Sequence, residues 1–203
     1  KFKKKFKVTI KINHLKTYFL IPNDFENYIS NILAALAVMS IFFDISKINK
    51  NIFNNFKVPN GRGDISKIKI NKKNLNLIDE SYNSNPLSLK PAILNYDKIN
   101  SNKSKKYLLL GDMLELGQHS KKLHQSMVAV INRSNIDKVF VKGRNVSFIF
   151  NSVLNSKKGR ILDSNSQIID LIKNHFNNND YLMIKASNAT GFNKMVNNLK
   201  GLK

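Results

Sequence analysis

The chain has 203 residues, 42% of them hydrophobic, which is enough to bury the core of one large domain or of one domain with part of another. It contains no cysteine, which excludes disulfides and thiolate metal sites, and no uninterrupted apolar run that is long enough for a transmembrane helix. The formal net charge is +21, but only four of the 34 basic residues are arginines, and the lysines are spread along the chain. This pattern favours a compositional bias, compatible with attraction of an anionic substrate, over the gathered arginines and aromatics of a nucleic-acid-binding protein.

The first part of the chain predicts a strand pair followed by helices. Apolar and polar residues alternate at the start, as in a half-buried strand, and the pair is expected to turn at Asn13 and His14. The expected elements are a strand over 6–13, a strand over 17–21, a helix over 24–43 and a helix over 45–56. The segment 58–63, which reads VPNGRG, interrupts regular structure. A domain boundary is therefore predicted between residues 58 and 59.

After this break, predicted strands alternate with predicted helices. Strands are expected over 65–70, 75–78, 106–110, 138–141, 160–162 and 181–184, and helices over 86–99, 118–133, 146–154, 164–176 and 192–199. Such alternation is typical of an α/β fold with a mostly parallel sheet. Right-handed crossovers would bring the loops that follow the parallel strands to one edge of the sheet, where ligands bind in open α/β folds.

Two of these strands deliver acidic residues to the loops that follow them. The apolar run 75–78 ends in Asp79 and Glu80, and the apolar run 107–110 ends in Gly111 and Asp112. A carboxylate at the carboxyl end of a parallel strand lies at the edge where ligands bind. These two loops are therefore the best candidates for a binding site.

Two long motifs in these loops resemble those of the Mur ligase family. Residues 79–86 read DESYNSNP and residues 111–117 read GDMLELG. Shorter matches occur in the same order along the chain: Asn31-Ile32-Leu33-Ala34-Ala35, Gly61-Arg62-Gly63, His124 and Lys185-Ala186-Ser187. The resemblance implies a Rossmann-like carboxyl-terminal Mur ligase domain over residues 59–203, preceded by the end of the central ATP-binding domain over residues 1–58.

The motifs are most similar to those of the family branch that joins D-alanyl-D-alanine to UDP-N-acetylmuramoyl-tripeptide in peptidoglycan precursor synthesis. The resemblance implies ATP and Mg²⁺ as cofactors, an acyl-phosphate intermediate, a cytoplasmic monomer, and no nucleic acid partner or membrane span. The sequence holds no G-x-x-x-x-G-K-[ST] phosphate loop. We therefore expect a carboxyl-terminal fragment that is inactive alone, with the catalytic lysine and the Mg²⁺ ligands upstream.

For the nucleotide, the resemblance assigns Asn31 to adenine, Arg62 to the phosphates and Asp79 to the ribose. An arginine fork suits phosphate oxygens, and a carboxylate at a strand end can accept both ribose hydroxyls. Each residue also has an ordinary structural interpretation. These are a helix-surface amide for Asn31, a solvated turn residue for Arg62 and a capping carboxylate for Asp79.

For the substrates, the resemblance assigns Tyr82, Asn83 and Asn85 to the dipeptide, because amide side chains both donate and accept hydrogen bonds. An Asx turn before the following proline is the alternative, and at least one of the three is expected to be structural. Glu115 is expected either to hold the incoming ammonium group or to cap the helix that begins near residue 118. Lys185 is expected to meet a carboxylate or a phosphate.

Three residues bear on how closely the chain follows the family pattern. His124, a lone histidine on a predicted helix, is expected to be packed rather than catalytic. Ser84 replaces an alanine of the pattern, and Ala186 replaces a glycine. If that glycine has a positive φ, the alanine is expected to carry backbone strain.

Three other interpretations stay open. Another amide ligase of the same family is disfavoured by residues 79–86, because the branch that adds the third residue shows a D-Y-A-H pattern there. A basic nucleic-acid-binding module is suggested by charge alone, and a steep loss of affinity for random duplex with salt would support it. The chain can also be a degenerate, non-catalytic remnant.

Overall fold

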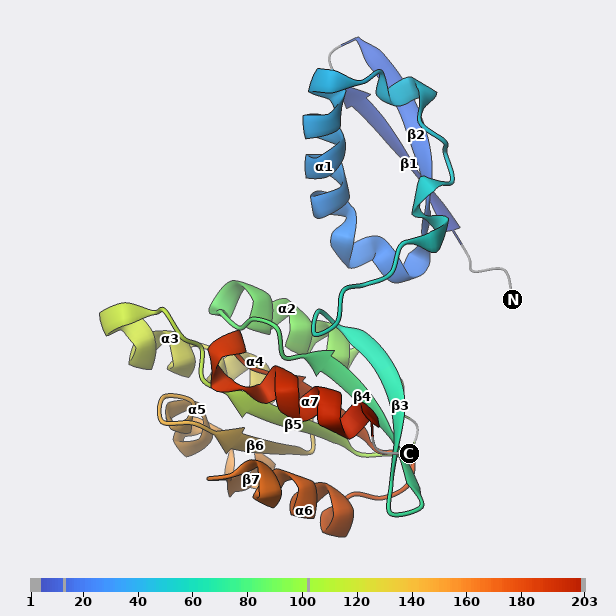
Figure 1. The fold of residues 1–203 in the computed structure, drawn as a ribbon. Helices are drawn as coiled ribbons and strands as arrows, with labels where there is room; N and C mark the ends of the chain where they lie inside the picture. The colour runs from blue at the N-terminus through green and yellow to red at the C-terminus, as the bar shows by residue number, and fades with distance from the viewer. Residues whose placement is uncertain (1–4, 13, 102, 202–203) are drawn as a thin grey trace. The chain divides into compact units, whose positions relative to one another are not determined.

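The structure, a computed structural model, describes residues 5–12, 14–101 and 103–201. The chain divides into two compact units, Lys1–Lys57 and Val58–Lys203 (Figure 1). This division adjoins the boundary predicted between residues 58 and 59. That the first unit is the end of a central ATP-binding domain stays a prediction.

The first unit is a strand pair with one helix. Strands β1 (Lys5–Ile12) and β2 (Leu15–Pro22) are antiparallel, as predicted, although Asn13 of the predicted turn lies outside the described residues. A 3₁₀ turn over Asn23–Tyr28 precedes helix α1 (Ile29–Phe42). The α-helix therefore begins later than the predicted residue 24, and its N-cap residue, Tyr28, makes no side-chain capping bond.

The helix predicted over residues 45–56 is wrong. The structure has two short 3₁₀ turns there, Ile45–Lys47 and Ile52–Asn55. Local side chains take the backbone N–H groups: the Asp44 carboxylate accepts from the Ser46 N–H at 2.9 Å, and the Asn49 amide oxygen accepts from the Asn51 N–H at 2.9 Å. The Asp44 bond is an N-cap, which an α-helix would also accept, whereas the Asn49 bond takes an N–H that a continuous α-helix would need, and the apolar spacing alone did not reveal it.

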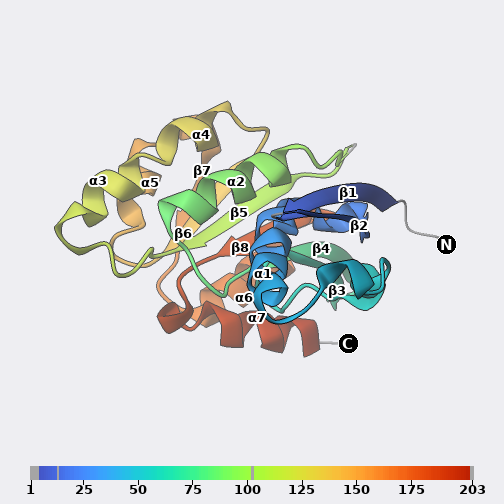
Figure 2. The same ribbon diagram turned by 90° about the horizontal axis from the view of Figure 1, so that it is seen from above.

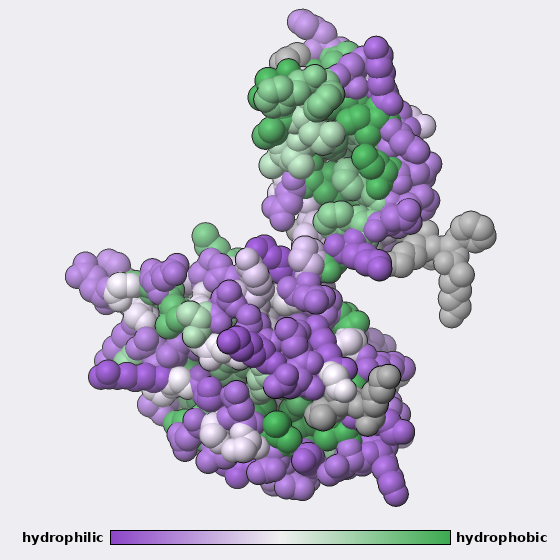
Figure 3. All heavy atoms as spheres, viewed as in Figure 1, coloured by the Kyte–Doolittle hydropathy of each residue, from purple (hydrophilic) through white to green (hydrophobic). Residues whose placement is uncertain are grey.

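Helix α1 is apolar on nearly all sides, yet few of its residues are buried within the unit. Its buried residues are Ile32 and Leu36, whereas Ile41 and Phe42 are 75% and 73% exposed. Figure 3 shows these apolar surfaces on the first unit. At 14 residues α1 is too short to cross a bilayer, and no other helix in the described ranges meets the length and hydropathy required.

The second unit is built on a six-stranded sheet. Its strands are β3 (Asp64–Ile70), β4 (Lys73–Glu80), β5 (Lys106–Gly111), β6 (Lys138–Lys142), β7 (Lys158–Ile161) and β8 (Tyr181–Lys185). Their order is β3-β4-β8-β5-β6-β7, with only the β3–β4 pair antiparallel. The predicted α/β fold with a mostly parallel sheet is confirmed. The loops after β4, β8, β5, β6 and β7 share one edge.

Helices cover both faces of this sheet (Figure 2). One hydrophobic core lies between the sheet and helices α2 (Pro86–Asp97), α4 (Val128–Arg133) and α5 (Ser147–Ser152). A second core lies against α6 (Asn165–His175) and α7 (Phe192–Gly201). Helix α3 (Ser120–Gln125) packs beside α5.

The single helix predicted over 118–133 is wrong, because α3 and α4 are separate. The Ser126 hydroxyl donates to the Leu123 carbonyl at 2.7 Å, and the Met127 N–H turns to the His124 carbonyl at 3.1 Å. The Met127 N–H thus bonds three residues back instead of four, which interrupts the α-helical hydrogen bonds between α3 and α4.

Several lysines donate to carbonyls at helix ends. Lys73 donates to two carbonyls at the end of α6, both at 2.9 Å, and Lys106 donates to the last carbonyl of α2 at 2.9 Å. Lys157 donates to two carbonyls just after α4, at 2.7 and 2.8 Å. Cations at helix carboxyl ends satisfy carbonyls that have no partner within the helix and interact favourably with the helix dipole.

Candidate functional site

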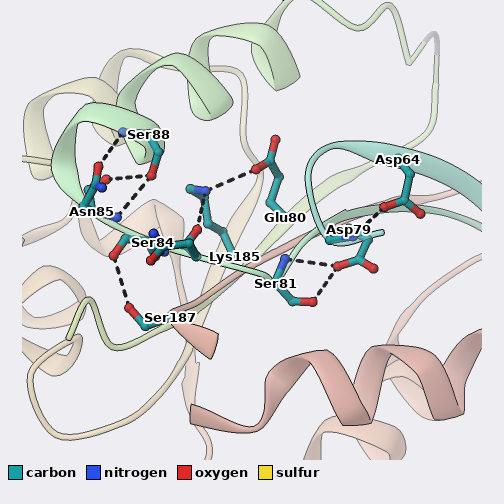
Figure 4. Close-up of polar contacts among 11 residues, drawn as sticks. Asp64, Asp79, Glu80, Ser81, Ser84, Asn85, Ser88, Lys185 and Ser187 are labelled. Atoms are coloured by element: carbon teal, nitrogen blue, oxygen red, sulfur yellow. Dashed lines mark hydrogen bonds and ion pairs between the residues drawn. The ribbon is translucent and has the colours of Figure 1, made fainter. Parts of the chain in front are cut away.

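Three loops at the carboxyl edge of the sheet are tied together by Ser187. The Ser187 hydroxyl donates to the Ser84 carbonyl at 3.1 Å and accepts from the Leu114 N–H at 2.9 Å. Its own N–H donates to the Asp112 carbonyl at 3.1 Å. The two motif loops are therefore joined through the loop after β8, and Figure 4 shows the bond between Ser187 and Ser84. Sequence reasoning gave Ser187 no role, although it ends the matched segment Lys185-Ala186-Ser187.

Asp79 is buried, and both of its carboxylate oxygens accept hydrogen bonds. Its side chain is 2% exposed. One oxygen accepts from the Ser81 N–H at 3.0 Å and from the Ser81 hydroxyl at 2.6 Å, and the other accepts from Lys200 at 2.6 Å. The carboxylate thus shapes the loop that follows β4. Its predicted contact with ribose stays a prediction.

Arg62 lies on a turn that packs against the same loop. Gly61 and Gly63, with φ of 77° and 94°, give this turn its shape, and a Cβ on Gly61 would lie 2.9 Å from the Cβ of Tyr82. The Arg62 guanidinium lies over the Tyr82 ring, 4.5 Å from its centroid. Both side chains are exposed, so the structure brings one predicted nucleotide residue and one predicted dipeptide residue together at the surface.

Lys185 meets a carboxylate, but one of its own chain. Its side chain is 1% exposed, and its ammonium donates to Glu80 at 3.2 Å and to the Asn83 carbonyl at 2.9 Å. Burial lowers the pKa of Lys185, while the Glu80 carboxylate acts in the opposite direction. Lys185 thus holds both ends of the loop between Glu80 and Asn83 (Figure 4).

Of the residues predicted to face the dipeptide, Asn85 has a structural role. It is the N-cap of α2: its side-chain oxygen accepts from the Ser88 N–H at 2.9 Å, and its N–H donates to the Ser88 hydroxyl at 3.1 Å. This is a capping box. Asn83 is exposed and its side-chain oxygen accepts from the Ser84 N–H at 2.7 Å. Substrate contacts by Tyr82, Asn83 and Asn85 stay predictions.

Glu115 is exposed and has a left-handed backbone, with φ of 61°. The next turn, Gly117–His119, begins after Leu116 and has no side-chain cap. The alternative in which Glu115 caps the following helix is therefore wrong. A non-glycine residue with positive φ carries strain, which concentrates at functional sites, and the ammonium contact of Glu115 stays a prediction.

His124 is fully buried and supports the second motif loop. Its Nε2 accepts from the Met113 N–H at 3.1 Å, so Nδ1 carries the proton and donates to the Ser120 carbonyl at 2.8 Å. The imidazole is therefore packed, as expected, and holds the loop in place.

The strain expected at Ala186 is absent. Ala186 is not among the residues with positive φ, and its side chain is fully buried. A Cβ on Gly111 would lie 2.6 Å from the Cβ of Ala186 and 2.6 Å from the Phe192 ring. The space for the Ala186 methyl group is thus provided by the glycine of the neighbouring strand.

Replacing Gly111 with alanine is expected to lower the free energy of unfolding by about 1–3 kcal/mol, because the new methyl group overpacks a buried site. Urea denaturation measures this change. The second substitution Ala186→Gly is expected to restore part of the loss, and Gly201→Ala, with no heavy atom within 4 Å, is the control. A Gly111→Ala protein as stable as the parent would contradict the packing described.

Ser84→Ala is expected to raise the free energy of unfolding by about 1 kcal/mol. The residue is 2% exposed, and its hydroxyl is one of two buried side-chain oxygens without a partner among the described residues. An apolar group of nearly the same size removes this desolvation cost. Urea denaturation measures this change. The control is Ser88→Ala, which loses the hydrogen bonds of the Ser88 hydroxyl and is therefore expected to lose stability. A loss of stability in Ser84→Ala would show that the hydroxyl has a partner in solution.

A cavity of about 560 Å³ opens beside these loops, after β5, β6 and β7. Lys142 and Arg144 line it together with Asp112 and Asp163, so both signs of charge are present. One Asp112 oxygen accepts from the Val146 N–H at 2.7 Å. Sequence reasoning missed Lys142, Arg144 and Asp163, although they follow strands whose carboxyl ends share the edge. None of the predicted substrate residues lines this cavity.

Asn31 belongs to the first unit. It lies in the first turn of α1 and is exposed. Its predicted contact with adenine stays a prediction.

The family described as Mur ligase, glutamate ligase domain, matches residues 66–188. A UDP-N-acetylmuramoyl-tripeptide–D-alanyl-D-alanine ligase of Bacillus subtilis is 28% identical over 93% of the chain, and one of Rickettsia prowazekii is 27% identical over 87%. The chain spans only 41% and 37% of the lengths of these two curated relatives.

Solved structures share the fold. The MurF ligase from Thermotoga maritima in complex with ADP superposes with a TM-score of 0.70 at 18% identity, over 99% of this chain and 44% of the other. MurF from Acinetobacter baumannii superposes with a TM-score of 0.73 at 20% identity, over 97% and 43%. At these identities the likeness concerns the fold.

Proposed function

Because the chain belongs to the Mur ligase family, we propose that it forms part of an ATP-dependent ligase that joins D-alanyl-D-alanine to UDP-N-acetylmuramoyl-tripeptide. One observation carries this proposal. Ser187 joins the two motif loops, and beside them lies a cavity that is lined by both basic and acidic side chains. ATP would convert the tripeptide carboxylate to an acyl phosphate with release of ADP, and the dipeptide amine, after losing a proton, would attack the acyl carbon and displace phosphate. A reaction on nucleotide-linked substrates would take place in the cytoplasm.

On the nucleotide side, this chain supplies positioning and charge, which dominate phosphoryl transfer. The Arg62 guanidinium is exposed, and its place over the Tyr82 ring limits the directions in which it can point. It would pair with phosphate oxygens. Asp79 would accept from the ribose hydroxyls, and Asn31 would contact adenine.

Mg²⁺ would neutralise phosphate charge in such a reaction. Within the described ranges, no group of three or more histidine or carboxylate side chains is gathered, and no step is assigned to the ion through these residues.

On the amine side, the cavity fits a small zwitterion. Lys142 and Arg144 would bind the dipeptide carboxylate, and Asp163 would hold its ammonium group. Arginine suits a carboxylate because its planar fork can make two parallel hydrogen bonds. A dipeptide held at both ends would present its amine in one orientation, which lowers the entropic cost of attack.

The test is an assay of ATP-dependent amide formation by the complete gene product with the UDP-linked tripeptide and D-alanyl-D-alanine. Arg144→Met is expected to raise the KM for the dipeptide at least about tenfold and to leave the KM for ATP unchanged. Arg160→Met, an exposed arginine outside the cavity, is the matched control. Joining of a single amino acid instead would assign another amide ligase of the family, and no ATP-dependent joining would refute the proposal.

A further inference from the structure

Two carboxylates face each other across the first strand pair of the sheet. Asp64 and Asp79 are directly paired in the antiparallel register of β3 and β4. Like charges at such positions repel each other, and the Asp79 side chain is only 2% exposed, so water screens the repulsion poorly. Some cation must therefore compensate this pair.

Lys200 supplies that cation from the last turn of α7. Its ammonium lies 2.6 Å from an oxygen of Asp64 and 2.6 Å from an oxygen of Asp79. Burial lowers the pKa of Lys200, but the hydrogen bonds and charges of the two aspartates outweigh this and raise it. The lysine is therefore charged at neutral pH and bridges both carboxylates.

Each aspartate uses its other oxygen to hold part of the candidate nucleotide site. The second oxygen of Asp64 accepts from the Gly61 N–H at 2.8 Å, which fixes the turn that carries Arg62. The second oxygen of Asp79 accepts from the Ser81 N–H and hydroxyl, at 3.0 and 2.6 Å (Figure 4). One lysine thus orients two carboxylates, and each carboxylate orients one loop.

We propose that Lys200 is a positioning residue for ATP, acting through Asp64 on the Arg62 turn and through Asp79 on the loop after β4. The proposal rests on the proposed function. It goes beyond the motifs, because neither Lys200 nor Asp64 belongs to a matched segment. Without Lys200 the two carboxylates separate, the Gly61 and Ser81 hydrogen bonds lengthen, and the Arg62 guanidinium loses its fixed direction.

Amide hydrogen exchange tests the positioning without any activity. In Lys200→Met, exchange at Gly61 and Ser81 is expected to be at least about tenfold faster, with Leu109 and Leu182 in the sheet core unchanged. The control is Lys194→Met, an exposed lysine on the same helix. Unchanged exchange at Gly61 and Ser81 overturns the proposal, and so does an equal acceleration throughout the sheet, because either result leaves Lys200 without a specific effect on the loops.

Steady-state kinetics of the complete gene product test the consequence for ATP. Lys200→Met is expected to raise the KM for ATP about tenfold and to leave the KM for D-alanyl-D-alanine unchanged. Lys200→Arg is expected to retain the parental KM, since a guanidinium can also bridge two carboxylates. An equal rise in both KM values, or an unchanged KM for ATP, overturns the proposal.

The double variant Asp64→Asn/Lys200→Met separates charge compensation from simple loss of a side chain. Asparagine keeps an oxygen for the Gly61 N–H and removes the repulsion, so the KM for ATP is expected to return to within about threefold of the parent. Additive losses in the double variant contradict the mechanism. If the parent enzyme shows no ATP-dependent joining, the proposed function fails, whereas the exchange experiment still decides whether Lys200 positions the two loops.

Discussion

Lys185→Met is expected to abolish ATP-dependent joining and to lower the free energy of unfolding by about 3 kcal/mol. The Lys185 side chain is 1% exposed and holds the Glu80 carboxylate and the Asn83 carbonyl at 3.2 and 2.9 Å. Its removal leaves Glu80 without its cation and the Asn83 carbonyl without its donor, so the loop between them loses its shape. Urea denaturation and the joining assay measure the two effects.

A second substitution distinguishes the effect of losing the ion pair from the effect of losing the conformation of the loop. In Lys185→Met/Glu80→Gln, stability is expected to recover in part, because no unpaired charge remains, while joining stays abolished. Lys90→Met, an exposed lysine on α2, is the matched control and is expected to behave like the parent. A Lys185→Met protein with parental activity would show that this loop is not part of the site.

Asp79→Asn and Arg62→Ala are each expected to raise the KM for ATP at least about tenfold, with the KM for the dipeptide unchanged. Asparagine retains an oxygen for the two Ser81 bonds, at 3.0 and 2.6 Å, but it loses the charge and the oxygen that accepts from Lys200. Asp79→Ala removes those bonds as well and is expected to cost about 3 kcal/mol of stability in addition. Initial-rate measurements at varied ATP give the KM values.

The matched control for the lost carboxylate is Asp170→Asn, an exposed residue on α6. Glu80→Ala is unsuitable as a neutral comparison, because Glu80 is the partner of the buried Lys185. If Asp79→Asn binds ATP as the parent does, Asp79 shapes the loop and does not contact the nucleotide.

Strands β4, β5, β6 and β8 could be predicted because each contains a short apolar run between clear breaks, whereas β7 (Lys158–Ile161), which lacks such a run, overlaps the predicted strand 160–162 only in part. The strand predicted over 106–110, for example, is β5 (Lys106–Gly111), in which every residue is buried. The helices predicted over 45–56 and 118–133 failed for a different reason. Their apolar spacing is helical, but the Asn49 side chain takes the Asn51 N–H, and the Met127 N–H bonds three residues back, to His124, instead of four.

The candidate site could be predicted only where a motif identified it. The sequence located the loops after β4 and β5, but it contained no sign that Ser187 joins them or that Lys200 bridges Asp64 and Asp79. Both contacts join residues more than 70 positions apart, and register and helix placement alone bring them together. In a chain with 34 basic residues, composition cannot single out one structural lysine.

The lysines that donate to helix carbonyls differ from the exposed lysines in how readily their amines can react. Lys73 and Lys106 already use their ammonium groups within the fold, and Lys106 is 4% exposed. An acylating reagent would therefore modify exposed amines such as Lys90 first, lowering the net charge while the fold persists. Acylation that reached Lys73 or Lys106 would remove a helix-end donor, so unfolding would begin at the carboxyl ends of α6 and α2.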